Sequence, residues 1–394
     1  MAGDKLLEQE EKAFGRKYVG NEIAYLKEVL ASGKLTSLHG GKLVPRFEEA
    51  FAKLLGAKHA VAINTCMSAL HAGVMSAGAG AGSEVICDCE FVFGAMAVLY
   101  TNAIPVFIDI DPVTHNMNPD LIEAAITDRT KAIITTHAWG LPAEMDRVVE
   151  IAHRHGLLVI EDCAQALLAD YKGRFTGTWG DVGCFSFQGS KQLSIGDGGM
   201  TTAATDELRK RIASQAGAPT FLAVAHNLDF NYRMNEPTAA VGLAQLEVMP
   251  AFIEQLRRNA RYYDEAVDGC SWIRLQRGPE GANHSFYDWA ATFTGDDQGL
   301  SLDEFKKAVE DADFSSISTG YTKMPAYKHP MIANRGAHAF HCPENAGHSG
   351  RYDDGTCPVA EHVIPRLILA YPVEPEETAK REAEKLHAVI ERLS

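Results

Sequence analysis

Four polar residues in the middle of the chain have the types and the spacing of a cofactor site. Asp162 closes the apolar run 157–162, and Gln165 follows it three residues later. Ser186 closes a later apolar run, and Lys191 follows it in a glycine-flanked segment. Ligands of open α/β sheets gather at the carboxyl ends of strands, so these side chains can share one crevice. A carboxylate that keeps a pyridine nitrogen protonated and a lysine that forms a Schiff base suit a pyridoxal phosphate (PLP) site.

Seven short apolar segments, separated mostly by helical patterns, would have to position these residues. We expect strands at residues 59–65, 84–88, 105–110, 131–137, 157–162, 183–187 and near 199–204. Apolar strands that alternate with helices are typical of a parallel sheet covered on both faces. The predicted fold class is therefore α/β, with a mostly parallel seven-stranded sheet.

The pattern changes near residue 250. Helical patterns at 251–267 and 376–393 flank an irregular middle that contains many Gly and His residues. We predict a large α/β domain over residues 1–250, which begins with a helical segment and holds the cofactor. Residues 251–394 are predicted to form a smaller α+β domain.

Composition excludes several classes of protein. The 394 residues are 46% hydrophobic and carry 37 Lys and Arg against 52 Asp and Glu, a net charge of −15. This balance indicates a folded protein, disfavours nucleic acid as a partner and favours small-molecule substrates. The eight cysteines are not needed to stabilise a chain of this length, and the charged N-terminus has no signal-peptide pattern. No apolar run is long enough to span a membrane, so we expect a cytoplasmic protein with reduced thiols.

The glycines of the segment AGAGAGS, residues 77–83, do not form a dinucleotide-binding motif. Their spacing is not G-x-G-x-x-G, and they follow a predicted helix and precede a strand. Dinucleotide-binding glycines follow a strand and precede a helix, so we interpret this segment as a turn. A Rossmann dehydrogenase is thereby disfavoured.

Several longer segments resemble the DegT/StrS family of sugar and cyclitol aminotransferases. These are PLP enzymes of fold type I, the aspartate aminotransferase fold. The resemblance covers about residues 20–375. It is carried by the segments FEEAFAKLLGAKHAVAINT, PVFIDIDP, VIEDCAQA, GDVGCFSFQGSK with GDGGM, and FNYRMNEPTAAVGLAQLE.

The resemblance implies the catalytic pair and the contacts of the cofactor ring. Lys191 would form the Schiff base and, once released, would move the proton between substrate and cofactor. Asp162 would pair with the pyridinium nitrogen, and Gln165 would approach the phenolic oxygen. Phe91 would stack on the ring.

The resemblance also implies how the phosphate is held. Ser186 and the helix N-terminus at Thr65, Cys66, Met67 and Ser68 would bind it, because such a terminus favours anions. Asn231 resembles a residue that the family donates to the phosphate from a second subunit. We therefore expect a homodimer with shared active sites.

The chain departs from the family pattern at several positions. Thr65-Cys66-Met67 replaces the common Ser-Gly-Thr, Asp197 replaces a glutamate, and Glu90 precedes Phe91 where threonine is usual. Gln188 replaces an aromatic residue of many nucleotide-sugar aminotransferases. With Gln188 at this position, the chain resembles the branch that acts on scyllo-inosose-type cyclitols or makes 3-amino-5-hydroxybenzoate.

The substrate contacts are the least constrained part of the sequence interpretation. Candidates are Trp139, Gln188, Tyr287 and His329, although core packing or surface placement also accounts for most of them. The His- and Cys-rich segment 329–358 has no metal-ligand spacing, so we predict no metal site.

The predicted function is a PLP-dependent aminotransferase that moves an amino group from glutamine or glutamate to a keto-cyclitol or keto-sugar. Secondary-metabolite, antibiotic or aminosugar biosynthesis is the expected setting. One alternative is a PLP-dependent dehydratase or aromatising enzyme of the 3-amino-5-hydroxybenzoate type. A second is a catalytically idle regulatory protein on the same scaffold.

Overall fold

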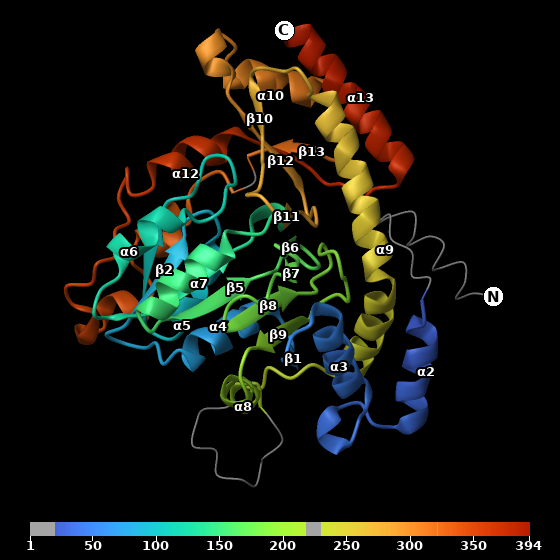
Figure 1. The fold of residues 1–394 in the computed structure, drawn as a ribbon, viewed down its shortest axis with the longest axis vertical. Coiled ribbons are helices and arrows are strands. Elements are labelled where there is room, and N and C mark those ends of the chain that lie inside the picture. The colour runs from blue at the N-terminus through green and yellow to red at the C-terminus, as the bar shows by residue number, and fades with distance from the viewer. Residues whose placement is uncertain (1–19, 218–229, 321) are drawn as a thin grey trace.

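Seven strands form the central sheet of the computed structural model, which describes residues 20–217, 230–320 and 322–394 (Figure 1). The charged N-terminal stretch 1–19, interpreted above as lacking a signal peptide, lies outside the described residues. In spatial order the strands are β1 (His59–Ile63), β9 (Gly199–Ala203), β8 (Val182–Ser186), β5 (Leu158–Asp162), β4 (Thr130–Thr136), β2 (Glu84–Asp88) and β3 (Ile104–Ile108). β9 runs antiparallel to β1 and β8, and the other pairs are parallel. The predicted mostly parallel seven-stranded sheet is confirmed.

Helices cover both faces of this sheet. One face packs against α4 (Cys66–Ser76), α5 (Val92–Tyr100) and α8 (Asp206–Gln215), and the other against α6 (Ile122–Ala125) and α7 (Met145–Arg154). Consecutive side chains of β5 point to opposite faces of the sheet: Val159 packs with α7 and Ile160 with α4. Asp162 is two residues after Ile160, so it lies on the α4 side of the sheet.

The smaller sheet lies at the other end of the molecule. It is antiparallel in the order β10 (Ile273–Leu275), β12 (Trp289–Phe293), β14 (Leu367–Ala370), β13 (Ile317–Thr319), and α10 (Leu302–Asp311) and α13 (Glu376–Leu393) pack on it. A three-stranded sheet of β6 (Asp170–Tyr171), β7 (Arg174–Phe175) and β11 (Ala282–Asn283) lies between the two parts.

The long helix α9 (Glu236–Ala266) joins both parts of the molecule (Figure 1). Its first half packs against α2 (Glu22–Ser32) and α3 (Leu43–Leu55), and its second half against α13. The predicted boundary at residue 250 therefore falls inside one continuous helix rather than in a linker.

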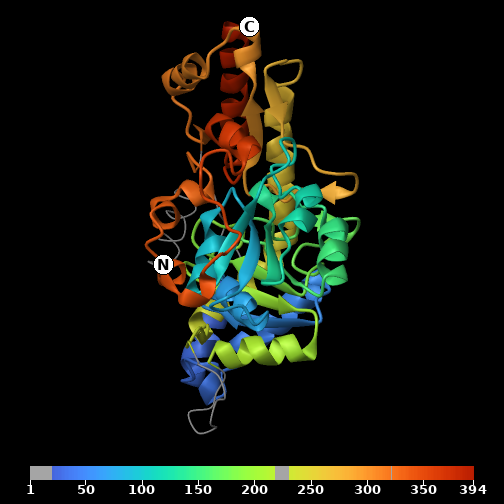
Figure 2. The same cartoon turned by 90° about the vertical axis from the view of Figure 1, so that its left-hand side faces the viewer.

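Part of the C-terminal third also returns to the large domain. Tyr327, Ile332, Tyr352 and Val363 are buried in the same core as α4 and α5. This segment includes α11 (Pro330–Ala333) and α12 (Pro358–Val363) and covers the side of the sheet opposite α7 (Figure 2). The predicted small domain 251–394 thus contributes to the core of the large sheet as well as to its own. Within the described residues, no helix combines the length and the apolar character needed to cross a membrane.

Candidate active site

One cavity of about 410 Å³ lies at the carboxyl ends of the central strands. Thr136, Asp162 and Ser186 are the last residues of β4, β5 and β8, and all three line it. Among the predicted site residues, those that line this cavity are Thr65, Cys66, Met67, Phe91, Asp162, Gln165, Ser186, Gln188, Lys191 and Tyr287. The structure thus brings together residues that are widely separated in the sequence, as the strand-end rule predicts.

Asp162 is a buried acid with little compensation for its charge. It is 3% exposed, and its Oδ1 accepts a hydrogen bond from the Ala164 N–H (3.0 Å). Burial raises the pKa of Asp162 to about 6, and the nearby Asp88 carboxylate adds to this rise. A carboxylate in such a place is stabilised by a cation placed against it. The protonated pyridine nitrogen of PLP is such a cation, so the residues fit the cofactor.

Lys191 lies across the cavity in a loop held by its own backbone. Its N–H donates to the Gln188 carbonyl (2.8 Å), and its Nζ lies 4.1 Å from the centroid of the Tyr287 ring. The Gln188 side chain accepts hydrogen bonds from the N–H (2.8 Å) and hydroxyl (2.7 Å) of Ser190. Gln188 therefore shapes the loop that carries Lys191 as well as lining the cavity.

The N-terminus of α4 forms the end of the cavity that suits a phosphate. Thr65 is its N-cap, and the Thr65 hydroxyl accepts the N–H of Ser68 (3.1 Å). The N–H groups of the first turn and the positive end of the helix dipole favour an anion there. β9 approaches closely because Gly199 has no side chain: a Cβ there would lie 2.9 Å from the Cys66 nitrogen.

Asp88 and Thr136 form a supporting group that the sequence analysis missed. The Asp88 carboxylate accepts the N–H of Phe91 (3.3 Å) and both the N–H (3.2 Å) and hydroxyl (2.7 Å) of Thr136. It thereby ties the turn that carries Phe91 to the end of β4. Asp88 ends one predicted strand and Thr136 is the last residue but one of another, so the strand-end rule points to this pair.

Trp139 supports the cavity from behind instead of lining it. It is fully buried, and its backbone N–H donates to Gln165 Oε1 (2.7 Å). Its ring lies edge-on to Phe91, with centroids 5.2 Å apart. Its φ of 62° is in the left-handed region, where a side chain of this size is rare. This placement argues against a contact between Trp139 and the substrate.

Three further candidates lie outside the lining of the cavity. Ser68 is buried beneath it in α4, while His329 and Asn231 are exposed. His329 caps α11, where its Nδ1 accepts the Met331 N–H (3.4 Å). Phe93, which no pattern pointed to, lines the cavity although it is 48% exposed.

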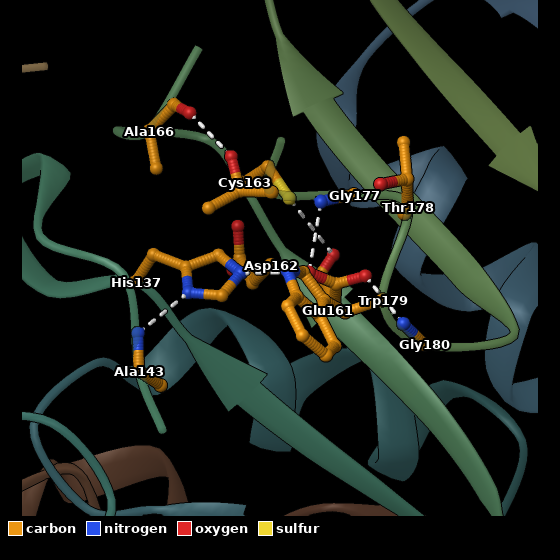
Figure 3. Close-up of polar contacts among 12 residues, drawn as sticks. His137, Ala143, Glu161, Asp162, Cys163, Ala166, Gly177, Thr178, Trp179 and Gly180 are labelled. Atoms are coloured by element: carbon orange, nitrogen blue, oxygen red, sulfur yellow. Dashed lines mark hydrogen bonds and ion pairs between the residues drawn. The ribbon is translucent and has the colours of Figure 1, made fainter. Parts of the chain in front are cut away.

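A buried histidine–glutamate pair lies beside the cavity, on the other face of β5 (Figure 3). His137 Nδ1 accepts the Ala143 N–H (3.1 Å), so its Nε2 carries the proton that is donated to Glu161 (3.0 Å). Glu161 also accepts the N–H groups of Gly177 (2.8 Å) and Gly180 (2.6 Å). With Cys163 these two residues have the composition of a metal site, but the hydrogen bonds account for their arrangement.

We expect Glu161→Ala to destabilise the fold by about 3–5 kcal/mol, as removal of one partner from a buried charged network does. Three buried N–H groups would lose their acceptor. Urea denaturation of the variant and of wild type measures the loss. Glu150→Ala is the matched control, because Glu150 is exposed and pairs with Arg154 at 3.6 Å on the surface of α7. Equal effects of the two substitutions would contradict a structural role for Glu161.

Comparisons with known proteins agree with this geometry. GDP-perosamine synthase of Caulobacter vibrioides is 39% identical over 252 residues, 63% of this chain and 67% of the relative. The UDP-N-acetyl-3-dehydro-alpha-D-glucosamine 3-aminotransferase of Acidithiobacillus ferrooxidans is 35% identical over 332 residues, 84% and 83% of the two chains. The solved structure of S. venezuelae DesV in complex with a ketimine intermediate has a TM-score of 0.84 at 27% identity, covering 99% of this chain and 98% of that one.

The family itself follows from the extent of the match. Residues 17–351 match the DegT/DnrJ/EryC1/StrS aminotransferase family, which is most of the chain. The cavity at the strand ends, lined by a lysine and a buried acid, suits PLP. The chain therefore belongs to the DegT/DnrJ/EryC1/StrS aminotransferase family and is a PLP-dependent aminotransferase.

Proposed function

We propose that this enzyme moves an amino group from glutamate or glutamine to the keto group of a nucleotide-linked sugar, with Lys191 and Asp162 as its catalytic residues. The observation that carries the proposal is the single cavity that brings Lys191, Asp162 and the N-terminus of α4 together. The names of the two relatives above support a nucleotide-linked sugar as acceptor. Gln188, which resembles the cyclitol branch of the family, supports a keto-cyclitol instead. The test therefore includes both keto-cyclitols and nucleotide-linked keto-sugars.

PLP, when bound, supplies an electron sink for the carbon that loses its proton. Asp162 holds a proton on the pyridine nitrogen and so keeps that sink effective. Lys191 would hold the cofactor, and its Nζ, once released, would take the proton from the donor's α-carbon as a base and give it back as an acid. Reversal of the same steps on the acceptor places the amino group on the former keto carbon.

The remaining residues bind and orient. The first-turn N–H groups of α4, with Thr65 and Ser186, would hold the phosphate, and Phe91 would pack against the ring. Gln165 approaches the phenolic oxygen, with its side chain fixed by the Trp139 N–H. The buried Asp88 keeps Phe91 in place through its backbone N–H.

The acceptor is tested with the enzyme loaded with pyridoxamine phosphate. It is mixed with keto-cyclitols and with nucleotide-linked keto-sugars, and the amino product is measured by mass spectrometry. We expect amination of a nucleotide-linked keto-sugar. Amination of cyclitols alone would overturn the proposed acceptor. Loss of water without amination would support the dehydratase alternative, and inertness toward every amino donor would support the regulatory one.

We also propose that the active site is shared between two subunits. Asn231 is exposed and lies outside the cavity of its own chain. Beside it the rings of Phe230 and Tyr232 stack with centroids 5.5 Å apart, and Phe230 is 37% exposed. Exposed aromatic surface of this kind favours a contact with another chain. In a two-fold dimer, each site would take Lys191 from one chain and Asn231 from the other.

Mixing two inactive variants should restore activity. Asn231→Asp sets a carboxylate against the phosphate and is expected to weaken PLP binding, while Lys191→Ala removes the lysine. In a mixed dimer one site carries both changes and the other carries neither. Random re-pairing makes about half of the dimers mixed, so about a quarter of all sites should recover.

Turnover after reversible dissociation and mixing measures this recovery, with re-pairing followed by mass-tagged subunits. Recovery near zero despite complete re-pairing would show that Asn231 does not serve the partner's site. The predicted cytoplasmic location is a separate proposal, which the eight free thiols support.

A further inference from the structure

We propose that two tyrosines next to the small sheet, Tyr287 and Tyr371, position Lys191 whenever it is not joined to the cofactor. The Tyr287 ring holds the ammonium group, and the Tyr371 hydroxyl fixes the peptide that precedes the lysine. This inference rests on the proposed role of Lys191. It adds two positioning residues, one of which the sequence analysis took for a substrate contact.

The small sheet brings the two tyrosines together. β12 and β14 are antiparallel, with Trp289 opposite Ala370. Tyr287 lies two residues before Trp289 and Tyr371 one residue after Ala370, so both leave the sheet at the same end. Their rings meet edge to face with centroids 6.0 Å apart. That end of the sheet faces the loop that carries Lys191.

Tyr287 offers its ring face to the lysine. The Nζ of Lys191 lies 4.1 Å from the ring centroid, within the reach of a cation–π interaction. Tyr287 is 6% exposed, and such an interaction is stronger where water is excluded. The Tyr287 hydroxyl lies 3.3 Å from the Ser190 hydroxyl, which fixes the ring relative to the loop.

Tyr371 acts on the backbone of the same loop. Its hydroxyl donates to the Ser190 carbonyl at 2.6 Å, and this carbonyl belongs to the peptide bond with Lys191. The Gln188 side chain holds the N–H and hydroxyl of Ser190. Ser190 is therefore fixed on two sides, and the Cα of Lys191 is restrained with it.

Two acidic side chains interact with the charge of Lys191. Asp162 ends β5 and Asp288 precedes β12. Burial raises the pKa of Asp162 to about 6 and that of Asp288 to about 7, and the positive charge of Lys191 offsets part of each rise. Asp197 and Cys66 also line the cavity. The ring of Tyr287 adds to these carboxylates by stabilising the ammonium group without carrying a charge of its own.

The lysine's proton affinity tests the role of the Tyr287 ring. In the pyridoxamine phosphate form, acetylation of Lys191 by acetic anhydride is followed against pH by peptide mass spectrometry, and the midpoint reports the pKa of Lys191. Tyr287→Leu removes the ring, so we expect the midpoint to fall by about 0.5 pH unit. Tyr287→Phe is the matched control, since it keeps the ring, and its midpoint should equal that of wild type.

The hydroxyl of Tyr371 is tested by the rate at which PLP joins Lys191 in the apoprotein. Tyr371→Phe removes one hydrogen bond, so we expect that rate to fall about three- to tenfold with the Lys191 midpoint unchanged. Tyr262→Phe is the control, because the Tyr262 hydroxyl bonds to Glu376 at 2.7 Å, outside the cavity lining. An unchanged rate in Tyr371→Phe would overturn the role of its hydroxyl.

Borohydride reduction and peptide mapping separate this inference from the proposed function. If the pyridoxyl group is on Lys191 but Tyr287→Leu keeps the wild-type midpoint, the role of the ring is wrong and the proposed function stands. If the pyridoxyl group is on another lysine, the proposed role of Lys191 fails and the inference fails with it. Should Tyr287→Leu not fold by circular dichroism, Tyr287→Met provides the ring-free variant, with the same expected fall.

Discussion

Lys191→Ala is expected to lower turnover by about 10⁴-fold or more, because one residue both anchors the cofactor and moves the proton. The fold should survive. The loop is held by backbone hydrogen bonds from Lys191 N–H to the Gln188 carbonyl (2.8 Å) and from Ile195 N–H to the Phe187 carbonyl (3.0 Å), which alanine keeps. Non-covalent PLP binding should also survive, since the phosphate and ring contacts come from other residues.

Steady-state rates with saturating amino donor measure the loss, and circular dichroism checks the fold. Lys172→Ala is the control: Lys172 is a half-exposed lysine that pairs with Asp146 at 2.6 Å and does not line the cavity. Its turnover should equal that of wild type. Substantial activity in Lys191→Ala, or a pyridoxyl group mapped to Lys172, would show that the lysine is wrongly assigned.

The central sheet and the strand-end residues could be predicted from the sequence because their signals are local. Each buried strand is a short apolar run, and the residue that ends it, such as Asp162 or Ser186, faces the crevice by the geometry of parallel sheets. The N-cap at Thr65 is likewise a local signal, since its hydroxyl satisfies the N–H three residues on.

The helix that runs through the predicted boundary at residue 250 has no local signal in the sequence, because long-range packing holds it together. Proline in a helix interior normally breaks the helix, yet α9 continues through Pro250. Its two halves are buried against α2 and α3 on one side of that residue and against α13 on the other. The His- and Cys-rich segment 329–358 falls within the predicted small domain, but its scattered apolar residues, such as Ile332 and Tyr352, complete the large core.

The contacts behind the cavity were missed for a similar reason. The hydroxyl of Tyr371 and the carbonyl of Ser190 are 181 residues apart in the sequence, and only the pairing of β12 with β14 brings them together. Trp139 was singled out for its aromatic ring. Its actual contribution, an N–H aimed at Gln165 by a left-handed backbone, has no signal in the sequence.

Asp162→Asn is expected to lower kcat and kcat/KM together by several orders of magnitude. An amide cannot hold a proton on the pyridine nitrogen by charge, so an interaction that matters mainly in the transition state is lost. Binding of the amino donor should change little. Asn keeps the Oδ1 that accepts the Ala164 N–H (3.0 Å), so the local turn should be preserved. A variant with nearly normal kcat would mean that Asp162 serves only as a structural acceptor.

The same substitution should stabilise the apoprotein at high pH. No such gain is expected if Asp162 serves only as a hydrogen-bond acceptor that holds the local fold. Burial raises the pKa of Asp162 from 3.8 to about 6, so the folded protein must ionise a buried acid as the pH rises through this range. The contribution of Asp162 to folding stability therefore falls as the pH rises from about 4 through 6, by about 3 kcal/mol in total. Asn has no charge to bury, so it should recover most of that loss at pH 8 and little of it at pH 4.

Urea denaturation of both apoproteins at pH 4 and pH 8 measures the difference. Asp181→Asn is a suitable comparison, since the Asp181 carboxylate also accepts a backbone N–H, from Val159 (2.8 Å), but lies outside the cavity lining. It should give no gain at pH 8. A gain in stability together with a loss of turnover would show that the ionised Asp162 serves the cofactor and lowers the folding stability of the apoprotein. A loss of stability at both pH values would instead assign it to the fold and remove it from the proposed mechanism.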